Sequence, residues 1–139
     1  MTAKAKILVV EDETAVAMMM VFLLTRAGCD VETAWNFEKA LRLAQSSEFD
    51  LITLDINLPG TDGFEIGRRL RQFSHLRNTP VIFVSGGATD ENRRRAREFG
   101  AADYIGKPFE PTDFIFRIKS CLQAESRKRF MAEPEGVPA

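Results

Sequence analysis

The sequence has few of the side chains that build disulfide frameworks and soft-metal sites. It contains two cysteines, Cys29 and Cys121, and a single histidine, His75. Two distant cysteines give neither a disulfide framework nor a metal-ligand cluster, and we expect both to be reduced thiols packed as small apolar groups. His75 follows the third predicted helix, and we expect an exposed loop residue with no catalytic or phosphate-carrying role.

The sequence also lacks an excess of charge of either sign and a long apolar run. Its formal net charge is −1 over 139 residues, so no overall field attracts nucleic acid or acidic lipid. The basic segment 1–6 leads into only four apolar residues, too few for a signal peptide or a membrane-spanning helix. With 45% hydrophobic and 28% charged residues, the chain suits one globular domain. We therefore expect a cytoplasmic protein for which neither a membrane nor nucleic acid is the partner.

Strand-like and helix-like patterns alternate along the chain. Apolar runs predict strands at 7–10, 51–54 and 81–84, and shorter strands are expected at 31–34, as an edge strand, and at 102–105. Apolar residues spaced by three or four predict helices beginning near residues 14, 37, 66 and 111, and a polar, arginine-rich helix is expected from residue 90 to residue 99. Five strand-helix units in this order predict an α/β fold, a doubly wound parallel sheet of five strands with helices on both faces. We expect the domain to span 5–125. Residues 126–139 would be the end of the last helix and a tail, predicted to be disordered after about Phe130.

Polar side chains follow the strands at their carboxyl ends, where open α/β sheets bind ligands. They are Glu11 and Asp12 after the first strand, Asp55 after the third, Ser85 after the fourth and Lys107 after the fifth. Each has an ordinary alternative when taken singly, because acids often form turns or stabilise helix N-termini and loop lysines are usually solvated. Their joint position at one sheet edge favours a functional site.

Two turns border this edge. The segment 57–63 contains the turn formers Pro59, Gly60 and Gly63 and is expected to be a loop. Lys107 precedes Pro108, which rigidifies the turn that aims the lysine, and a cis bond is plausible there because X-Pro bonds tolerate it.

The acids at this edge would repel one another without a cation. Mg²⁺ prefers oxygen ligands, so we expect direct ligands from Asp12 and Asp55, with Glu11 acting through water. The backbone carbonyl of Asn57 would complete the set. Asp55 is also a candidate nucleophile, because carboxylates form aspartyl-phosphate intermediates.

Four motifs at these positions resemble the receiver domain of two-component response regulators, of the chemotaxis-regulator type. They are Ile-Leu-Val-Val-Glu-Asp at 7–12, Asp-Ile-Asn-Leu-Pro-Gly-Thr-Asp-Gly at 55–63, Val-Ser-Gly at 84–86 and Asp-Tyr-Ile-Gly-Lys-Pro-Phe at 103–109. The resemblance covers nearly the whole chain. It implies a flavodoxin-like sheet with strand order 2-1-3-4-5.

The resemblance implies that a histidine kinase or histidine phosphotransfer protein phosphorylates Asp55 with Mg²⁺. It implies that Ser85 is the switch hydroxyl, Tyr104 the switch aromatic and Lys107 the phosphate-binding lysine. Ser85 would move toward the phosphate while Tyr104 turns inward, which repacks the surface of helix 90–99, the last strand and the last helix. The domain would catalyse only its own phosphorylation and dephosphorylation, and it is not expected to be an enzyme acting on other substrates.

One departure concerns the loop after Ser85, where Gly86 and Gly87 carry no side chain. We hypothesise that Gly87 leaves the attacking water relatively free, while Asn57 partly screens it. An unchanged phosphoryl lifetime in Gly87→Glu would contradict this hypothesis.

Four residues are candidates for partner surfaces. Met18 and Phe22 lie opposite the inward face of the first helix, Phe116 lies away from the core on the last helix, and Arg94 belongs to a basic run. Isolated groups of this kind are also ordinary surface residues, and both interpretations stay open. In the family, the first helix docks the histidine donor. The face of the fourth and last helices serves output or dimerisation, so a phosphorylation-dependent homodimer is one expectation.

Three functions remain as alternatives. The first is a stand-alone receiver, and the second is a receiver module of a larger DNA-binding regulator or hybrid kinase, with the Pro- and Gly-containing tail as the start of a linker. The third is an aspartyl-phosphate phosphatase of related fold, which is disfavoured because Asn57 stands where those enzymes place their second acid. The sequence does not identify the kinase, the pathway or the output.

Overall fold

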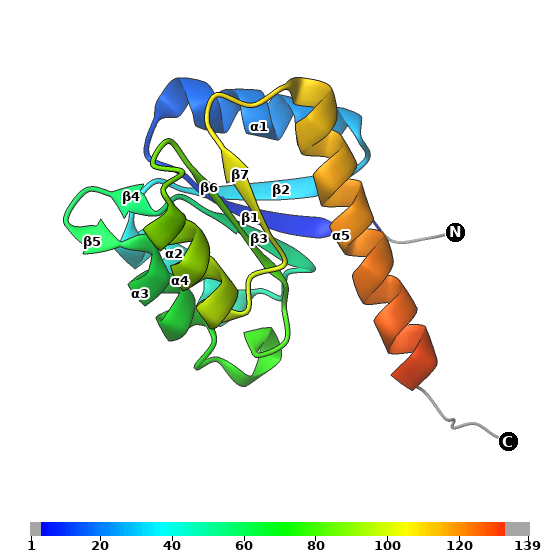
Figure 1. The fold of residues 1–139 in the computed structure, drawn as a ribbon. Helices are drawn as coiled ribbons and strands as arrows, with labels where there is room; N and C mark the ends of the chain where they lie inside the picture. Colours follow the sequence, from blue (N-terminus) through cyan, green and yellow to red (C-terminus); the bar gives the residue numbers. More distant parts are fainter. Residues whose placement is uncertain (1–3, 133–139) are drawn as a thin grey trace, which may run out of the picture.

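A computed structural model of the chain describes residues 4–132, and its centre is a parallel sheet (Figure 1). The main strands are β1 (Lys6–Val10), β2 (Asp30–Ala34), β3 (Leu51–Leu54), β6 (Val81–Ser85) and β7 (Asp103–Gly106). All neighbouring pairs are parallel, and their order is β2-β1-β3-β6-β7. This order confirms the predicted 2-1-3-4-5 arrangement and the α/β class.

Helices cover both faces of the sheet. They are α1 (Thr14–Arg26) and α5 (Pro111–Ala132) on one face, and α2 (Phe37–Ser46), α3 (Gly63–Leu70) and α4 (Asp90–Phe99) on the other. Strand β1 shows why its sequence is continuously apolar. Ile7 and Val9 pack toward α1 and α5, whereas Leu8 and Val10 pack toward the other three helices.

The helix ends follow from the residues at their boundaries. The Asn36 side chain accepts a hydrogen bond from the Lys39 amide at 2.8 Å and caps α2. Thr89 caps α4 in the same way through the Asn92 amide. Gly28 and Gly100 follow α1 and α4 with φ of +93° and +88°, a region that favours glycine.

The segment predicted as a loop after Asp55 contains a small hairpin. Strands β4 (Asn57–Leu58) and β5 (Thr61–Asp62) pair antiparallel around a turn in which Gly60 has φ of +75°. A Cβ at Gly63 would lie 2.3 Å from the Asp55 carbonyl oxygen, so only glycine fits where α3 begins. The Lys107–Pro108 bond is cis, as the sequence suggested.

Two further predictions concerned the chain outside the sheet. His75 is exposed, but it lies in a short 3₁₀ helix, η1 (Ser74–Leu76), and its Nε2 is 2.7 Å from the Ala44 carbonyl oxygen. Helix α5 continues without a break to Ala132, slightly past the predicted end of periodicity, and the predicted tail lies outside the described residues. Within the described part, no helix combines the length and apolarity needed to span a bilayer.

Candidate functional site

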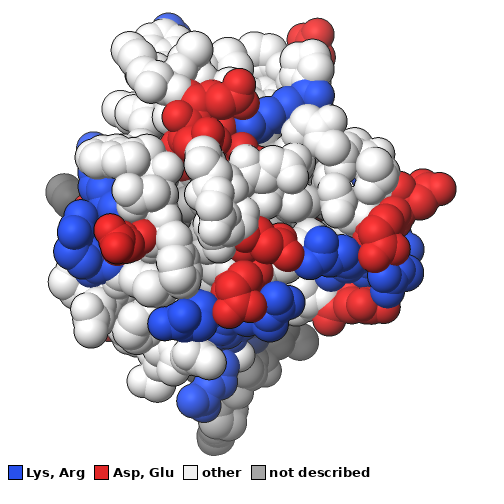
Figure 2. Space-filling model, turned by 90° about the vertical axis from the view of Figure 1, so that its left-hand side faces the viewer, with Lys and Arg blue, Asp and Glu red and all other residues white. Residues whose placement is uncertain are grey.

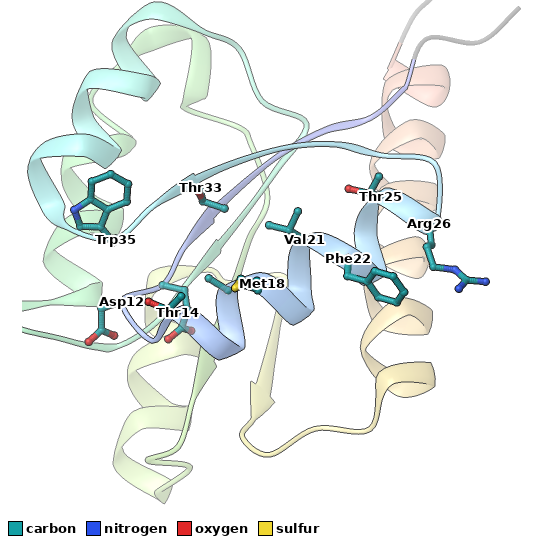
Figure 3. A pocket seen from close by; sticks show the side chains of 11 residues that line it. Asp12, Thr14, Met18, Val21, Phe22, Thr25, Arg26, Thr33 and Trp35 are labelled. Carbon is teal, nitrogen blue, oxygen red and sulfur yellow. The ribbon is translucent and has the colours of Figure 1, made fainter.

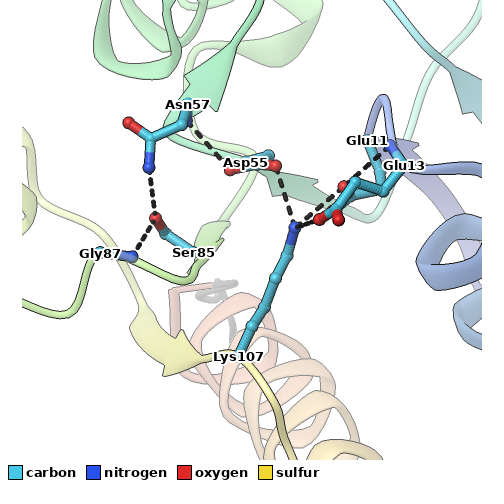
Figure 4. A network of polar contacts seen from close by, with 7 residues as sticks. All are labelled: Glu11, Glu13, Asp55, Asn57, Ser85, Gly87 and Lys107. Atoms are coloured by element: carbon cyan, nitrogen blue, oxygen red, sulfur yellow. Dashed lines mark hydrogen bonds and ion pairs between the residues drawn. The ribbon is translucent and has the colours of Figure 1, made fainter.

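The strand ends bring the predicted polar residues to one edge of the sheet (Figure 4). Glu11 follows β1, Asp55 follows β3, Ser85 ends β6, and Lys107 follows β7. Glu11, Asp55 and Ser85 are 3%, 4% and 0% exposed. Buried polar groups need partners, and at this edge Glu11 and Asp55 pair with Lys107, whereas Ser85 is held by Asn57 and Gly87.

Lys107 is the shared cation of this site. Its Nζ lies 2.9 Å from Glu11 Oε2, 3.0 Å from Asp55 Oδ2 and 2.9 Å from Glu13 Oε1. The Glu11 and Asp55 side chains are nearly inaccessible, whereas the Glu13 side chain is 60% exposed. The sequence did not single out Glu13, because an acid before a helix looks like favourable charge at the helix N-terminus.

Burial and neighbouring charges shift the pKa values of Glu11 and Lys107. Burial raises the pKa of Glu11 to about 7, opposed by the hydrogen bond from Lys107 and assisted by the charge of Asp55. Burial also disfavours the charged form of Lys107, but its hydrogen bonds to Glu11, Glu13 and Asp55 outweigh that effect and raise its pKa above the ordinary value. The lysine therefore stays charged at neutral pH.

The acids at this edge fit a divalent cation. Glu11, Asp12 and Asp55 each offer a carboxylate oxygen, and these oxygens lie within 4.8 Å of one another. Glu11 Oε1 is buried and has no hydrogen-bond partner among residues 4–132. An all-oxygen donor set with an unsatisfied buried carboxylate oxygen suits a hard cation such as Mg²⁺.

The Ser85 hydroxyl is held by the loops beside the acids (Figure 4). Its Oγ accepts a hydrogen bond from Asn57 Nδ2 at 3.2 Å and another from the Gly87 amide at 3.1 Å. The Asn57 amide nitrogen of the main chain donates to Asp55 Oδ1 at 3.0 Å. Asn57 therefore contacts both the acid and the hydroxyl.

Comparison with known families agrees with this geometry. The sequence model of the response regulator receiver domain matches residues 7–119. The chain belongs to the response regulator receiver domain family. Receiver domains are signalling domains of two-component systems, and the family implies a histidine kinase or phosphotransfer protein as partner.

Individual relatives agree with the assignment. The transcriptional regulatory protein ResD of Bacillus subtilis is 34% identical over 129 residues, which cover 93% of this chain and 52% of ResD. The chain spans about half the length of the curated relatives it matches. Among solved structures, the Vibrio cholerae chemotaxis protein CheY4 has a TM-score of 0.81 and 32% identity, covering 86% of this chain and 99% of CheY4. The receiver domain of the Pseudomonas aeruginosa sensor histidine kinase PA1611 has a TM-score of 0.78 and 26% identity, covering 87% of this chain and 99% of that domain, and it has a magnesium ion coordinated in its active site cleft.

Tyr104 is a residue of β7, and its side chain packs in the core between the sheet and α4. It is 9% exposed, and its hydroxyl donates to the Gly87 carbonyl at 2.8 Å. The Arg93 guanidinium lies 5.0 Å from the centre of its ring. The aromatic side chain that the resemblance marks as a switch is therefore inward in this structure.

Two of the candidate surface residues line one groove of the receiver domain (Figure 3). Met18 and Phe22 are 67% and 58% exposed and form its α1 wall, and Trp35 lies at its β2 side. The groove has a volume of about 670 Å³ and reaches Glu11 and Asp12. Its apolar surface thus continues to the edge of the acidic site.

The other two candidates lie elsewhere. Phe116 is 68% exposed on α5. Arg94 pairs with Glu91 and Glu98 of its own helix, and its neighbour Arg95 pairs with Asp62 at 2.6 Å. Figure 2 shows the face that carries α3 and α4, where basic and acidic surfaces lie side by side. The basic run of α4 is therefore largely engaged within the domain.

Proposed function

We propose that this chain is a phosphoacceptor domain and that Asp55 takes the phosphoryl group. The main support is the position of the buried Asp55 carboxylate. Its Oδ2 lies 3.0 Å from Lys107 Nζ, and one of its oxygens lies within 4.8 Å of carboxylate oxygens of Glu11 and Asp12. Phosphoryl transfer needs positioning and charge neutralisation and little covalent chemistry from the protein. We assign this role to the unit 5–125, with the rest of α5 and the tail beyond it.

The proposed reaction uses Asp55 as nucleophile. A carboxylate oxygen attacks the phosphorus of a phosphohistidine whose other ring nitrogen is protonated, the O–P bond forms, the P–N bond breaks, and the electron pair stays on the ring nitrogen, so that neutral imidazole leaves. Lys107 stands beside the acceptor oxygen and neutralises charge on the incoming group. Ser85 exchanges its present partners for a phosphoryl oxygen, and Tyr104 is the aromatic residue that responds.

Mg²⁺ is the cofactor that we infer for this site. Glu11, Asp12 and Asp55 would hold it, together with the backbone carbonyl of Asn57. When bound, it would neutralise the carboxylates and the phosphoryl oxygens. The unsatisfied Glu11 oxygen and the all-oxygen donor set support this choice.

The groove along α1 is proposed as the docking surface of the histidine donor. Its apolar wall of Met18 and Phe22 continues to Asp12, so a helix lying in it would bring its histidine toward Asp55. Phe22→Ser should therefore leave phosphorylation by acetyl phosphate unchanged and slow transfer from a phosphotransfer protein. Phe116→Ser, on α5, is the matched control, and equal effects of both variants would contradict this surface.

The central test is phosphorylation by acetyl phosphate with Mg²⁺, followed by intact mass. The wild type should gain one phosphoryl group, Asp55→Asn should gain none, and the exposed Asp30→Asn should behave as wild type. No mass change in the wild type, or phosphorylation that persists in Asp55→Asn, would overturn the proposal.

A further inference from the structure

The Gly87 carbonyl connects its loop to helix α4 and to strand β7. It accepts hydrogen bonds from the Asn92 side chain at 2.7 Å, the Tyr104 hydroxyl at 2.8 Å and the Thr89 amide at 2.8 Å. The amide of the same residue donates to Ser85 Oγ at 3.1 Å. Ser85 and Tyr104 thus meet at the two ends of one glycine.

This glycine lies in a segment with little conformational restraint of its own. Gly86 and Gly87 are consecutive, and glycine loses more backbone freedom on ordering than any other residue. A Cβ at Gly87 would lie 3.4 Å from Asn57 Nδ2 and 3.4 Å from Asn92 Nδ2, so the residue is held between two amide side chains. The Thr89 amide belongs to the N-cap residue of α4 and lies only two residues along the chain from Gly87. Among the three donors to the carbonyl, only Asn92 and Tyr104 act through their side chains, one from α4 and one from β7.

We propose that Asn92 is a positioning residue of the switch. Its side chain, fixed on the first turn of α4, holds the Gly87 carbonyl where the Tyr104 hydroxyl reaches it. A carbonyl oxygen has two lone pairs and here has three donors, so the loss of Asn92 would leave the oxygen satisfied. Asn92 therefore acts by holding the loop in place, because the Gly87 carbonyl oxygen would be satisfied without it. Its consequence for phosphorylation rests on the proposed function.

The backbone and the side chain of Asn92 serve separate purposes. Its amide donates to Thr89 Oγ1 at 3.1 Å and completes the cap of α4, and this bond does not depend on the side chain. Asn92→Ala and Asn92→Asp therefore keep the cap while removing the donor to Gly87. Arg97→Ala, at an exposed position on the same helix, is the matched control.

The first arm of the test reads Tyr104 without any phosphodonor. Tyr104 is the single tyrosine of the sequence, so 3-fluorotyrosine gives one ¹⁹F resonance from the whole chain. In Asn92→Ala and Asn92→Asp this resonance should move toward that of free 3-fluorotyrosine, and in Arg97→Ala it should not move. An unchanged resonance in both Asn92 variants would overturn the proposal.

The second arm measures binding of beryllofluoride with Mg²⁺, a stand-in for the phosphoryl group, by ¹H–¹⁵N spectra. Asn92→Ala should raise the half-saturating concentration about three- to tenfold, the scale of one hydrogen bond. In a Tyr104→Phe background the same change should have an effect of less than about twofold, because the coupled hydroxyl is gone. Equal effects in both backgrounds would indicate a merely structural residue and overturn the inference. If the wild type binds no beryllofluoride, the proposed function fails, and the ¹⁹F arm still decides the role of Asn92.

Discussion

Two buried threonines, Thr53 and Thr79, allow the cost of an unpaired buried hydroxyl to be measured; Thr53 lies on β3, the strand that leads to Asp55. Thr53 is 1% exposed, and its Oγ1 has no hydrogen-bond partner in the part of the chain that the structure describes. Its register neighbours are Val9 and Ile82. Thr79 is 8% exposed, but its Oγ1 donates to the Phe49 carbonyl at 3.3 Å. The same substitution, threonine to valine, should therefore have opposite effects at the two positions.

The magnitudes follow from the partners. A buried polar group without a partner costs about 1–3 kcal/mol, and valine replaces the Thr53 hydroxyl with a methyl group of similar shape. Thr53→Val should raise the free energy of unfolding by about 1–2 kcal/mol. Thr79→Val removes the hydrogen bond from Thr79 Oγ1 to the Phe49 carbonyl, which should lower the free energy of unfolding by about 1 kcal/mol. The expected difference between the variants is about 2–3 kcal/mol.

Urea unfolding followed by circular dichroism measures this difference, with unchanged m-values as the control for two-state behaviour. Thermal midpoints should differ in the same sense, by about 3–5 °C per kcal/mol for a chain of this size. Phosphorylation by acetyl phosphate should proceed in Thr53→Val as in wild type, because the hydroxyl makes no hydrogen bond to any residue of the site. A Thr53→Val protein less stable than wild type would refute the reasoning.

Two other predictions concern Lys107 of the site and Cys121 of α5. Lys107→Ala should lower the free energy of unfolding by about 3 kcal/mol or more without Mg²⁺, because it leaves buried Glu11 and Asp55 carboxylates without their cation. Millimolar Mg²⁺ should restore part of the loss, and identical losses with and without Mg²⁺ in urea unfolding would contradict the shared site. Burial raises the pKa of Cys121 to about 11, so about one thiol in a thousand is ionised at pH 8. Iodoacetamide should therefore modify Cys121 slowly at pH 8, and the rate should rise about tenfold for each pH unit up to that pKa. Intact mass measures the alkylation, and a rate at pH 8 as fast as in urea would show that the thiol is not protected.

The residues that the sequence located best are those whose position a strand fixes. Asp55 follows the apolar run 51–54, which predicts a buried strand, and Lys107 follows the short last strand of the sheet. Parallel strands place their carboxyl ends at one edge of the sheet. The contact of Lys107 with Asp55 and Glu11 follows from that arrangement. The sheet order came instead from the resemblance, because alternation alone predicts a parallel sheet and not which strands are neighbours.

The residues that the sequence located poorly depend on side-chain rotation or on backbone atoms. Glu13 contacts Lys107 only because its exposed side chain turns back over the site, and the local sequence does not encode that choice. The Gly87 carbonyl has no side chain to mark it, so its link to Asn92 and Tyr104 became visible only in three dimensions. The hairpin after Asp55 was not predicted because each of its strands has two residues, too few to show the alternation of apolar and polar residues that marks a strand.

Charge at the site explains why one lysine can serve both states of the proposed switch. Lys107 now balances Glu11 and Asp55, and a phosphoryl group on Asp55 would place new anionic oxygens beside the same ammonium. A divalent cation on the carboxylates would take over the neutralisation of Glu11 and free the lysine for the phosphoryl group. Lys107 would therefore exchange its carboxylate partner for a phosphoryl oxygen while its ammonium group stays in nearly the same place. Ser85 faces the opposite requirement, because contact with the phosphoryl group would compete with its bonds to Asn57 and to the Gly87 amide. The strain of that exchange would fall on Gly87, whose carbonyl is held by α4 and β7, and this is where a local charge event would pass to the surface of the domain.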